Sequence, residues 1–404
     1  MPVAPKLAAS KLSVLVVDDP PLAAGIKLLR GEWAERTGGQ LEIEDWTVEQ
    51  LLAATKLSAD LVIYPSRYVG TLVDRDGLRP VRKSVLQSDE VAFDDLFPLV
   101  RNATLPYGGQ VYALTLGEPP LMLMGSATDH DSDGQAKWDS VGNSSDVGSS
   151  QFRYPYAVAL IARGVSYTQS RGGATGWFDA DTMQPRIADP PYVKSLQKMI
   201  GNERPSTSRK DDVSIGWPTP GATKSSLYFS LPLADEVYNP LRDIWEKRET
   251  DKPLVFLGFA GRSVSVTRST RNSASAFKLL KWLVSESIAT QLSPRSEATV
   301  WFRKSQVAKA KRWLPNSAAS DETAAIVTKL LSSSNFYLLP RIPGIDEYLQ
   351  ALEEAILRAT SEELSAEEVL TEVVEQWNIL TDRYGRDRQR AAYRKHLGLH
   401  ENEQ

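Results

Sequence analysis

The chain has 404 residues, a length that suggests about two or three domains. Apolar residues make up 42% and charged residues 24%, which is ordinary for a globular protein and excludes disorder as the dominant state. Lys and Arg total 47 and Asp and Glu total 51, and the resulting net charge of −4 does not favour nucleic-acid binding. No apolar run approaches the roughly 18 residues that a membrane-spanning helix needs.

The chain has no cysteine and only three histidines, which are His130, His396 and His400. A disulfide framework, a thiolate zinc site and a cysteine nucleophile are therefore excluded. None of the histidines lies near a predicted strand end, so Ser-His-Asp catalysis and a histidine-ligated metal are not expected. We expect no cofactor and no enzymatic activity.

The first 65 residues alternate between strand and helix patterns. The chain begins with a loose arm over 1–11. The pattern then predicts a strand over 12–17, an amphipathic helix over 22–33 that Gly38-Gly39 ends, a strand over 41–43, a short helix over 48–54 and a strand over 60–65. This β-α-β-α-β order predicts a parallel sheet with helices on both faces.

The rest of the chain predicts a second α/β region. Residues 96–124 are typical of a segment that crosses from one lobe to another, and the Gly/Ser-rich stretch 125–150 is typical of a surface loop. Helices are predicted over 156–163, 192–200, 344–359 and 365–383, and strands over 212–217, 253–260 and 263–267. Ser273 is a candidate cap for a further helix, and Ser365 with Glu368 has capping-box spacing.

Residues 129–134 match the first half of a calcium-binding loop. Asp129, Asp131 and Asp133 alternate and Gly134 follows them, as such a loop requires. The ninth and twelfth positions, however, are lysine and serine instead of oxygen ligands of the expected kind. A solvated acidic loop is the favoured interpretation, and calcium is the weaker one.

Asp18 and Asp19 lie where the first strand meets the first helix. This position often contributes to a ligand site in open α/β sheets, where two carboxylates would accept hydrogen bonds from ligand hydroxyls. Plain capping of the helix by Asp19 is an equally good explanation. Tyr64 and Arg67, just past the third strand, would reach the same edge, although Tyr64 suits packing equally well.

Five of the ten tryptophans fall into two kinds. Trp33, Trp282 and Trp377 fit apolar stripes and are expected to pack in the core. Trp177 and Trp217 adjoin glycines, where an indole face would stack on a sugar ring, although packing at a lobe edge explains each of them equally well.

The order of several phrases resembles the extracellular solute-binding proteins of ABC importers, specifically the sugar-binding group related to maltose-binding protein. The phrases are EWAERTGG (32–39), DLVIYP (60–65), DGLRPV (76–81), YGGQVYAL (107–114), KWDS (137–140), IGW (215–217) and SASAFKLLKWLVSESIATQ (273–291). The resemblance covers roughly 12–395. Thr115 replaces the proline that ends the family's Y-A-L-P phrase, and a Gly/Ser-rich stretch replaces the helix after Trp-Asp.

The resemblance implies an α/β, two-lobed periplasmic-binding-protein-like fold of type II, with crossing strands as a hinge and a helical C-terminus. Residues 12–117 with 254–312 would form the first lobe, and 121–250 with 320–400 the second. The ligand cleft between the lobes would be lined by Asp19, Tyr64, Arg67, Glu118, Trp177, Trp217, Phe259 and Arg262.

The implied function is that of a monomeric substrate-binding component, which captures a mono- or oligosaccharide and delivers it to a membrane permease outside the cytoplasm. The family's export signal is not recognisable in this sequence. A ligand sensor or adaptor of the same fold is one alternative. A glycoside hydrolase using Asp19 and Glu118 is another, and it would need the two carboxyl groups roughly 5–10 Å apart.

Overall fold

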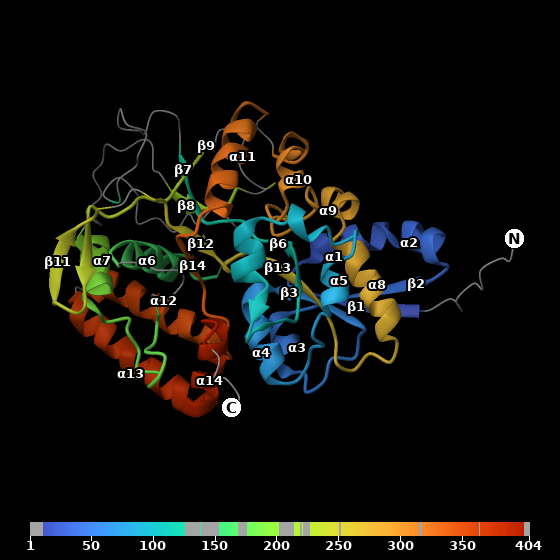
Figure 1. Ribbon diagram of the computed structural model, residues 1–404. Coiled ribbons are helices and arrows are strands. Elements are labelled where there is room, and N and C mark those ends of the chain that lie inside the picture. Colours follow the sequence, from blue (N-terminus) through green and yellow to red (C-terminus); the bar gives the residue numbers. More distant parts are fainter. Residues whose placement is uncertain are drawn as a thin grey trace, which may run out of the picture.

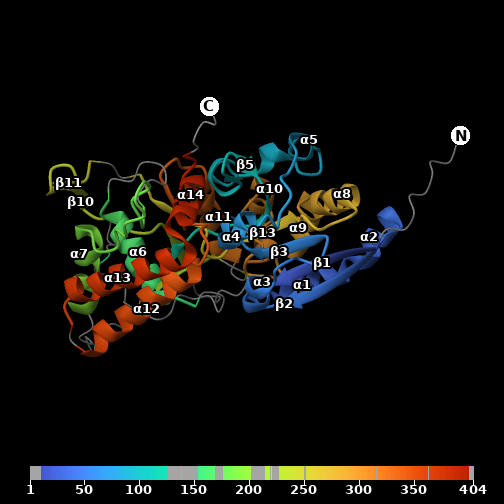
Figure 2. The same cartoon turned by 90° about the horizontal axis from the view of Figure 1, so that it is seen from below.

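The computed structural model describes residues 11–125, 138, 153–168, 176–201, 214–218, 220, 227–249, 252–314, 317–362 and 364–399. The described chain forms two lobes that lie side by side, with the N-terminal elements in one and the long C-terminal helices in the other (Figure 1, Figure 2). Residues 1–10 of the predicted arm, and nearly all of the predicted loop 125–150, lie outside the described residues. The helices in the described ranges include none with the length and apolarity to cross a bilayer.

The first lobe is built on a five-stranded sheet. Its strand order is β2 (Gln40–Trp46), β1 (Lys11–Val17), β3 (Leu61–Pro65), β13 (Arg262–Val266) and β6 (Leu114–Gly117). β1 pairs in parallel with both β2 and β3, which confirms the predicted parallel β-α-β-α-β unit. β13 runs antiparallel to β3 and β6, an addition that local sequence pattern did not predict because the pairing joins segments about 200 residues apart.

Alternating side chains of β1 divide between two apolar layers. Val14 and Val16 pack with helices on one face, whereas Leu15 and Val17 pack with helices on the other. The first face holds α1 (Pro20–Leu28), α2 (Arg30–Thr37), α8 (Ser273–Leu283) and α9 (Glu286–Leu292), and the second holds α3 (Val48–Ala53) and α4 (Val69–Asp74). Small elements complete this lobe: α5 (Lys83–Leu86), β4 (Pro106–Tyr107), β5 (Gln110–Val111), and the single turns η1 (Ser66–Tyr68), η2 (Phe93–Asp95) and η3 (Val100–Thr104).

Two local details differ from the predictions. The first amphipathic helix is two helices, because the chain breaks at Leu29 between α1 and α2. The cap of α8 is Asn272, whose side chain accepts from the Ser275 N–H, and Ser273 is the first helical residue. The packing predicted for the indoles holds: Trp33 and Trp282 are buried with ring centroids 5.2 Å apart.

The second lobe combines a small sheet with long helices. Its three-stranded sheet has the order β8 (Ser214–Gly216), β7 (Met122–Gly125) and β9 (Leu227–Phe229). The helices are α6 (Pro155–Ser166), α7 (Pro190–Gly201), α12 (Ile345–Glu362) and α13 (Ala366–Tyr384), and a hairpin of β10 (Glu236–Asn239) and β11 (Ile244–Lys247) packs beside them. The predicted capping box of Ser365 and Glu368 begins α13.

Three segments cross between the lobes. The first joins β6 to β7, the second joins β12 (Val255–Leu257) to β13, and the third joins β14 (Phe336–Leu338) to α12. β12 and β14 pair in parallel, and the Leu121 N–H donates to the Phe256 carbonyl at 3.0 Å, so the crossings support one another. The residue limits that we predict for each lobe stay a prediction.

The remaining helices are α10 (Lys304–Val307), η5 (Ala310–Arg312), α11 (Ser317–Leu331) and α14 (Arg386–His396). α14 contacts both lobes. Arg388 pairs with Asp74 at the end of α4, and the Lys395 carbonyl accepts from the Gly108 N–H at 3.1 Å. On the other side, Arg394 pairs with Asp181 at 2.6 Å. The last helix therefore spans the junction instead of only completing the second lobe.

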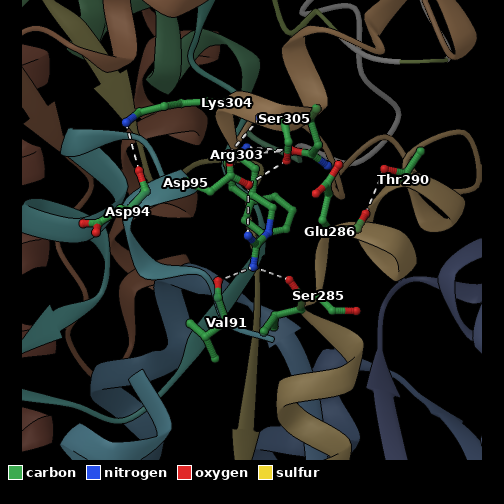
Figure 3. Close-up of polar contacts among 12 residues, drawn as sticks. Val91, Asp94, Asp95, Ser285, Glu286, Thr290, Arg303, Lys304 and Ser305 are labelled. Atoms are coloured by element: carbon green, nitrogen blue, oxygen red, sulfur yellow. Dashed lines mark hydrogen bonds and ion pairs between the residues drawn. The ribbon is translucent and has the colours of Figure 1, made fainter. Parts of the chain in front are cut away.

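A buried arginine ties three segments of the first lobe together (Figure 3). The Arg303 guanidinium donates to the Val91 carbonyl at 2.6 Å and to the Val284 carbonyl, and pairs with Asp95 at 3.1 Å. Ser305 donates to the same carboxylate from its N–H and its hydroxyl. Burial lowers the pKa of Arg303, which Asp95 opposes, so the charge depends on these partners.

Replacing this arginine tests that dependence. Arg303→Met nearly keeps the side-chain volume, but it takes the cation from the Asp95 carboxylate and the donor from two buried carbonyls, so we expect a loss of about 3–5 kcal/mol in the free energy of unfolding. Chemical denaturation of the variant measures it, and Lys304→Met, at the adjacent exposed position, is the control. Equal losses in both variants would contradict a structural role for Arg303.

Candidate functional site

The candidate site lies where one edge of the first lobe's sheet meets the second lobe. The carboxyl ends of β1 and β3 and the beginning of β13 share this edge, because Arg262 pairs with Pro65 in the antiparallel register. Asp19, Arg67 and Arg262 therefore lie close together, and Tyr64 is the neighbouring residue at the end of β3. Ligands of open α/β sheets bind at such strand ends.

Asp19 is fully engaged in structural contacts. Its Oδ1 caps α1 by accepting from the Leu22 N–H at 3.0 Å, and its Oδ2 accepts from the Ser296 hydroxyl at 2.6 Å. The Arg262 Nε lies 3.3 Å from the same Oδ2, and the two side chains are 4% and 0% exposed. Burial lowers the pKa of Arg262, and Asp19 counters that shift. Of the two interpretations of Asp19, helix capping is thus confirmed.

Asp18 holds the turn between β1 and α1. Its φ of +49° lies in the left-handed region, which is sparsely populated by residues other than glycine. The Asp18 carboxylate accepts from the Val48 N–H at 3.1 Å, and its carbonyl accepts from Arg262 at 2.9 Å. These contacts fix the edge of the sheet on which Arg262 and Arg67 lie.

Arg67 reaches across the junction to Asp346, in the first turn of α12. Its Nε lies 2.7 Å from Oδ1 and its Nη2 lies 3.3 Å from Oδ2, and the Tyr68 hydroxyl also donates to Oδ2. The two charged side chains are 9% and 16% exposed. Burial alone would lower the pKa of Arg67, but Asp346 and Tyr68 together outweigh burial and hold that pKa above its ordinary value.

A second pair of contacts lies at the rim of the same junction. Arg153, just before α6, lies 3.1 Å from Glu49 in α3 and 3.6 Å from Asp18. The pKa of Glu49 falls to about 2, chiefly through a backbone hydrogen bond and one to Thr47, with Arg153 adding to the shift. Both Glu49 and Arg153 are exposed, so their attraction contributes little to stability on its own.

Glu118 lies on the first crossing segment and binds the second. Its Oε1 accepts from the Gly258 N–H at 2.7 Å, and a Cβ on Gly261 would lie only 2.7 Å from its Oε2. Burial raises the pKa of Glu118 to about 7, against the opposing effects of the Gly258 hydrogen bond, Arg341 and Ser66. Glu118 therefore holds two crossings together in a tightly packed setting.

The predicted aromatic platforms are buried. Trp177 packs against Trp377 with ring centroids 4.9 Å apart, within the helical core of the second lobe. Phe259 faces Tyr337 at 6.5 Å, and Trp217 is buried beside Pro218. Tyr64 is buried as well, with its hydroxyl 2.8 Å from that of Ser265. In this arrangement of the lobes none of the eight predicted site residues is open to solvent.

The sequence analysis missed Asp346, Tyr68 and Arg153. An aspartate in the first turn of a helix is common because it favours the helix dipole, so Asp346 carries no local signal of a partner 279 residues away. Tyr68 is next to Arg67 in the sequence, and this adjacency to a predicted site residue was the one available indication that Tyr68 belongs to the site.

Two further candidate sites were considered. Asp129, Asp131 and Asp133 lie outside the described residues, and no group of three or more His, Asp or Glu side chains in the described ranges is placed to hold a metal ion. A surface pocket of about 520 Å³ lies between α1 and α9, lined by Gly25, Leu28, Leu29, Gln291, Leu292, Pro294 and Arg295. None of the eight predicted residues belongs to it.

The fold is that of the solute-binding proteins of ABC transporters, as comparison with solved structures shows. A ribitol complex of such a protein from Agrobacterium radiobacter has a TM-score of 0.64 and 17% identity, covering 92% of this chain and 98% of that one. The sugar-binding protein MalE from Xanthomonas citri has a TM-score of 0.65 and 14% identity, over 94% and 100%. The Thermus thermophilus maltotriose-binding protein, with maltotriose bound, has 0.63 and 15%, over 91% and 99%.

At these identities the likeness establishes the fold, and the predicted two-lobed α/β class is thereby confirmed. No protein-family model matches the chain, and no curated protein does.

The pKa of Glu118 generates a prediction about stability. Between about pH 4.5 and pH 7 the folded chain keeps a proton on Glu118 that the unfolded chain has released, so this group makes stability fall as the pH rises. Glu118→Gln cannot ionise and keeps an oxygen for the Gly258 N–H. As the pH rises from 4.5 to 8, we expect the free energy of unfolding of Glu118→Gln to increase by roughly 3 kcal/mol relative to that of the parent.

Denaturant unfolding of both chains across this pH range measures the difference, with Glu375→Gln, on the exposed face of α13, as the matched control. A difference that stays constant with pH would refute the raised pKa of Glu118.

Proposed function

We propose that the chain is the substrate-binding component of an ABC-type importer, which captures a mono- or oligosaccharide between its lobes and delivers it to a membrane permease outside the cytoplasm. The observation that carries this proposal is the facing of Arg67 and Asp346 across the junction at the sheet edge. A solute that enters there meets polar groups from both lobes at once, so its binding stabilises one relative orientation of the lobes.

The likeness of the fold to proteins whose structures contain ribitol, mannitol, maltose or maltotriose supports a carbohydrate or polyol as the solute. The predicted site residues suit such ligands. Arginine and carboxylate groups hydrogen-bond the hydroxyls of such ligands.

Access to this site requires the lobes to move apart. The contacts that join them include the Arg67–Asp346 pair, the Arg153 contacts and the ion pairs of α14. An apolar cluster also continues from Leu15 and Val62 of one lobe to Val158 and Leu349 of the other. The crossing segments provide the hinge. A solute that stabilised the closed orientation would then be enclosed from water.

A sensor or adaptor of the same fold, which signals to a partner protein, is a second candidate. The burial of all eight predicted site residues favours it, because a junction packed this tightly presents no open cleft. The hydrolase alternative has no support in the contacts of Asp19, because its Oδ1 caps α1 and its buried Oδ2 is occupied by Ser296 and Arg262.

A ligand screen separates importer component from adaptor. Thermal unfolding with mono- and oligosaccharides and polyols near 1 mM is expected to show a shift with one sugar class, since a ligand at 100 times its dissociation constant adds about 2.7 kcal/mol of stability. L-Alanine and putrescine are the negative controls. Stability that is unchanged by every sugar and polyol would contradict the importer proposal and favour the adaptor.

A further inference from the structure

The contacts of Asp346 define a site for a planar anion. One carboxylate receives three donors: the Nε and Nη2 of Arg67, at 2.7 and 3.3 Å, and the hydroxyl of Tyr68. A guanidinium that donates from two nitrogens to the two oxygens of one carboxylate is the strong, directional form of the ion pair. The arrangement selects a carboxylate over a single hydroxyl oxygen.

The donors and the acceptor belong to different lobes. Arg67 and Tyr68 form the turn after β3 in the first lobe, whereas Asp346 lies in the first turn of α12 in the second. Separation of the lobes therefore takes this carboxylate away from its three donors. The donors stay together, because both lie on the same short turn.

The charged groups that remain nearest to this edge are two arginines, Arg67 and Arg262, with the carboxylates of Asp18 and Asp19 beside Arg262. Arg262 is close enough to Arg67 for the two cations to affect each other, and the positive charge of Arg67 helps to lower the pKa of Arg262. The Asp19 carboxylate that offsets Arg262 stays in the first lobe, held by Ser296 and the α1 N-terminus. Departure of Asp346 thus removes one negative charge from a nearly buried group of two arginines.

We propose that the captured solute is an acidic sugar, such as a hexuronate, whose carboxylate takes the place of the Asp346 carboxylate on Arg67 and Tyr68. This inference rests on the proposed function and names the substrate class for its site. Asp346 acts as an internal substitute that keeps the donors satisfied when no solute is bound. A neutral sugar offers only hydroxyl oxygens, so the charge of Arg67 would be buried without a carboxylate partner. The free energy of binding would have to offset that cost.

Calorimetric titration with D-glucuronate and with D-glucose tests the proposal, because the two sugars differ only in the carboxylate. The parent chain is expected to bind D-glucuronate at least about tenfold more tightly than D-glucose. Asp346→Asn removes the internal competitor and is expected to strengthen D-glucuronate binding by about tenfold. Arg67→Gln is expected to abolish it, whereas Arg75→Gln, an exposed arginine of the same lobe, is the control.

Tyr68→Phe keeps the ring and removes one donor, so it remains informative if an Arg67 variant fails to fold. We expect it to weaken D-glucuronate binding by about threefold to tenfold and to leave D-glucose unchanged. Equal binding of the two sugars by the parent, Asp346→Asn and Tyr68→Phe chains would overturn the acidic-sugar inference and leave the importer proposal standing. Binding of neither sugar, together with an unchanged melting temperature across the whole panel of sugars and polyols, would overturn both.

Discussion

The relative orientation of the two lobes depends on the ion pair and hydrogen bonds that Arg67 and Tyr68 form with the Asp346 carboxylate. These contacts lie at the strand ends of the first lobe and at the start of α12, next to the third crossing segment. A nearly buried ion pair with good geometry is costly to break on one side, so the lobes either keep this contact or exchange it for an equivalent one.

An apolar layer surrounds that pair. The cluster containing Leu15, Val62 and Tyr64 of the first lobe is continuous with the cluster formed by α6, α12 and α13. Separating the lobes exposes part of this surface to water, at roughly 25 cal/mol per Å² of apolar area. Glu118 accepts a hydrogen bond from Gly258 and so joins two of the crossing segments. The hinge, the apolar layer and the ion pair therefore act on one equilibrium between orientations of the lobes.

Much of the fold follows from local sequence pattern. The short apolar, β-branched run of β1, the apolar stripe of α1 and α2, and the Ser365–Glu368 capping box each encode their element within a few residues. The break at Leu29 was not predicted because the apolar stripe continues through it. The antiparallel addition of β13 was not predictable in the same way, since the pairing of Val264 with Ile63 depends on the whole chain between them.

The candidate site was predicted less completely. Asp19, Arg67 and Arg262 do share one edge, because residues that follow or begin adjacent strands must lie together. The partner of Arg67 was missed because charge pairing across 279 residues leaves no periodic trace. Trp177 was assigned to the cleft from its neighbouring glycine, but its ring packs on Trp377, a contact that only the tertiary structure reveals.

The distance between the lobes in solution is the most direct test of the account. The chain has no cysteine, so spin labels attach only to cysteines that are introduced. Suitable substitutions are Leu28→Cys on α1, where the leucine is 68% exposed, and Leu357→Cys on α12, where it is 43% exposed. Pulsed electron spin resonance on this double variant is expected to give one narrow distance distribution, with a longer population when Asp346→Asn is added. Identical distributions with and without Asp346→Asn would contradict the central claim that this carboxylate governs the orientation of the lobes.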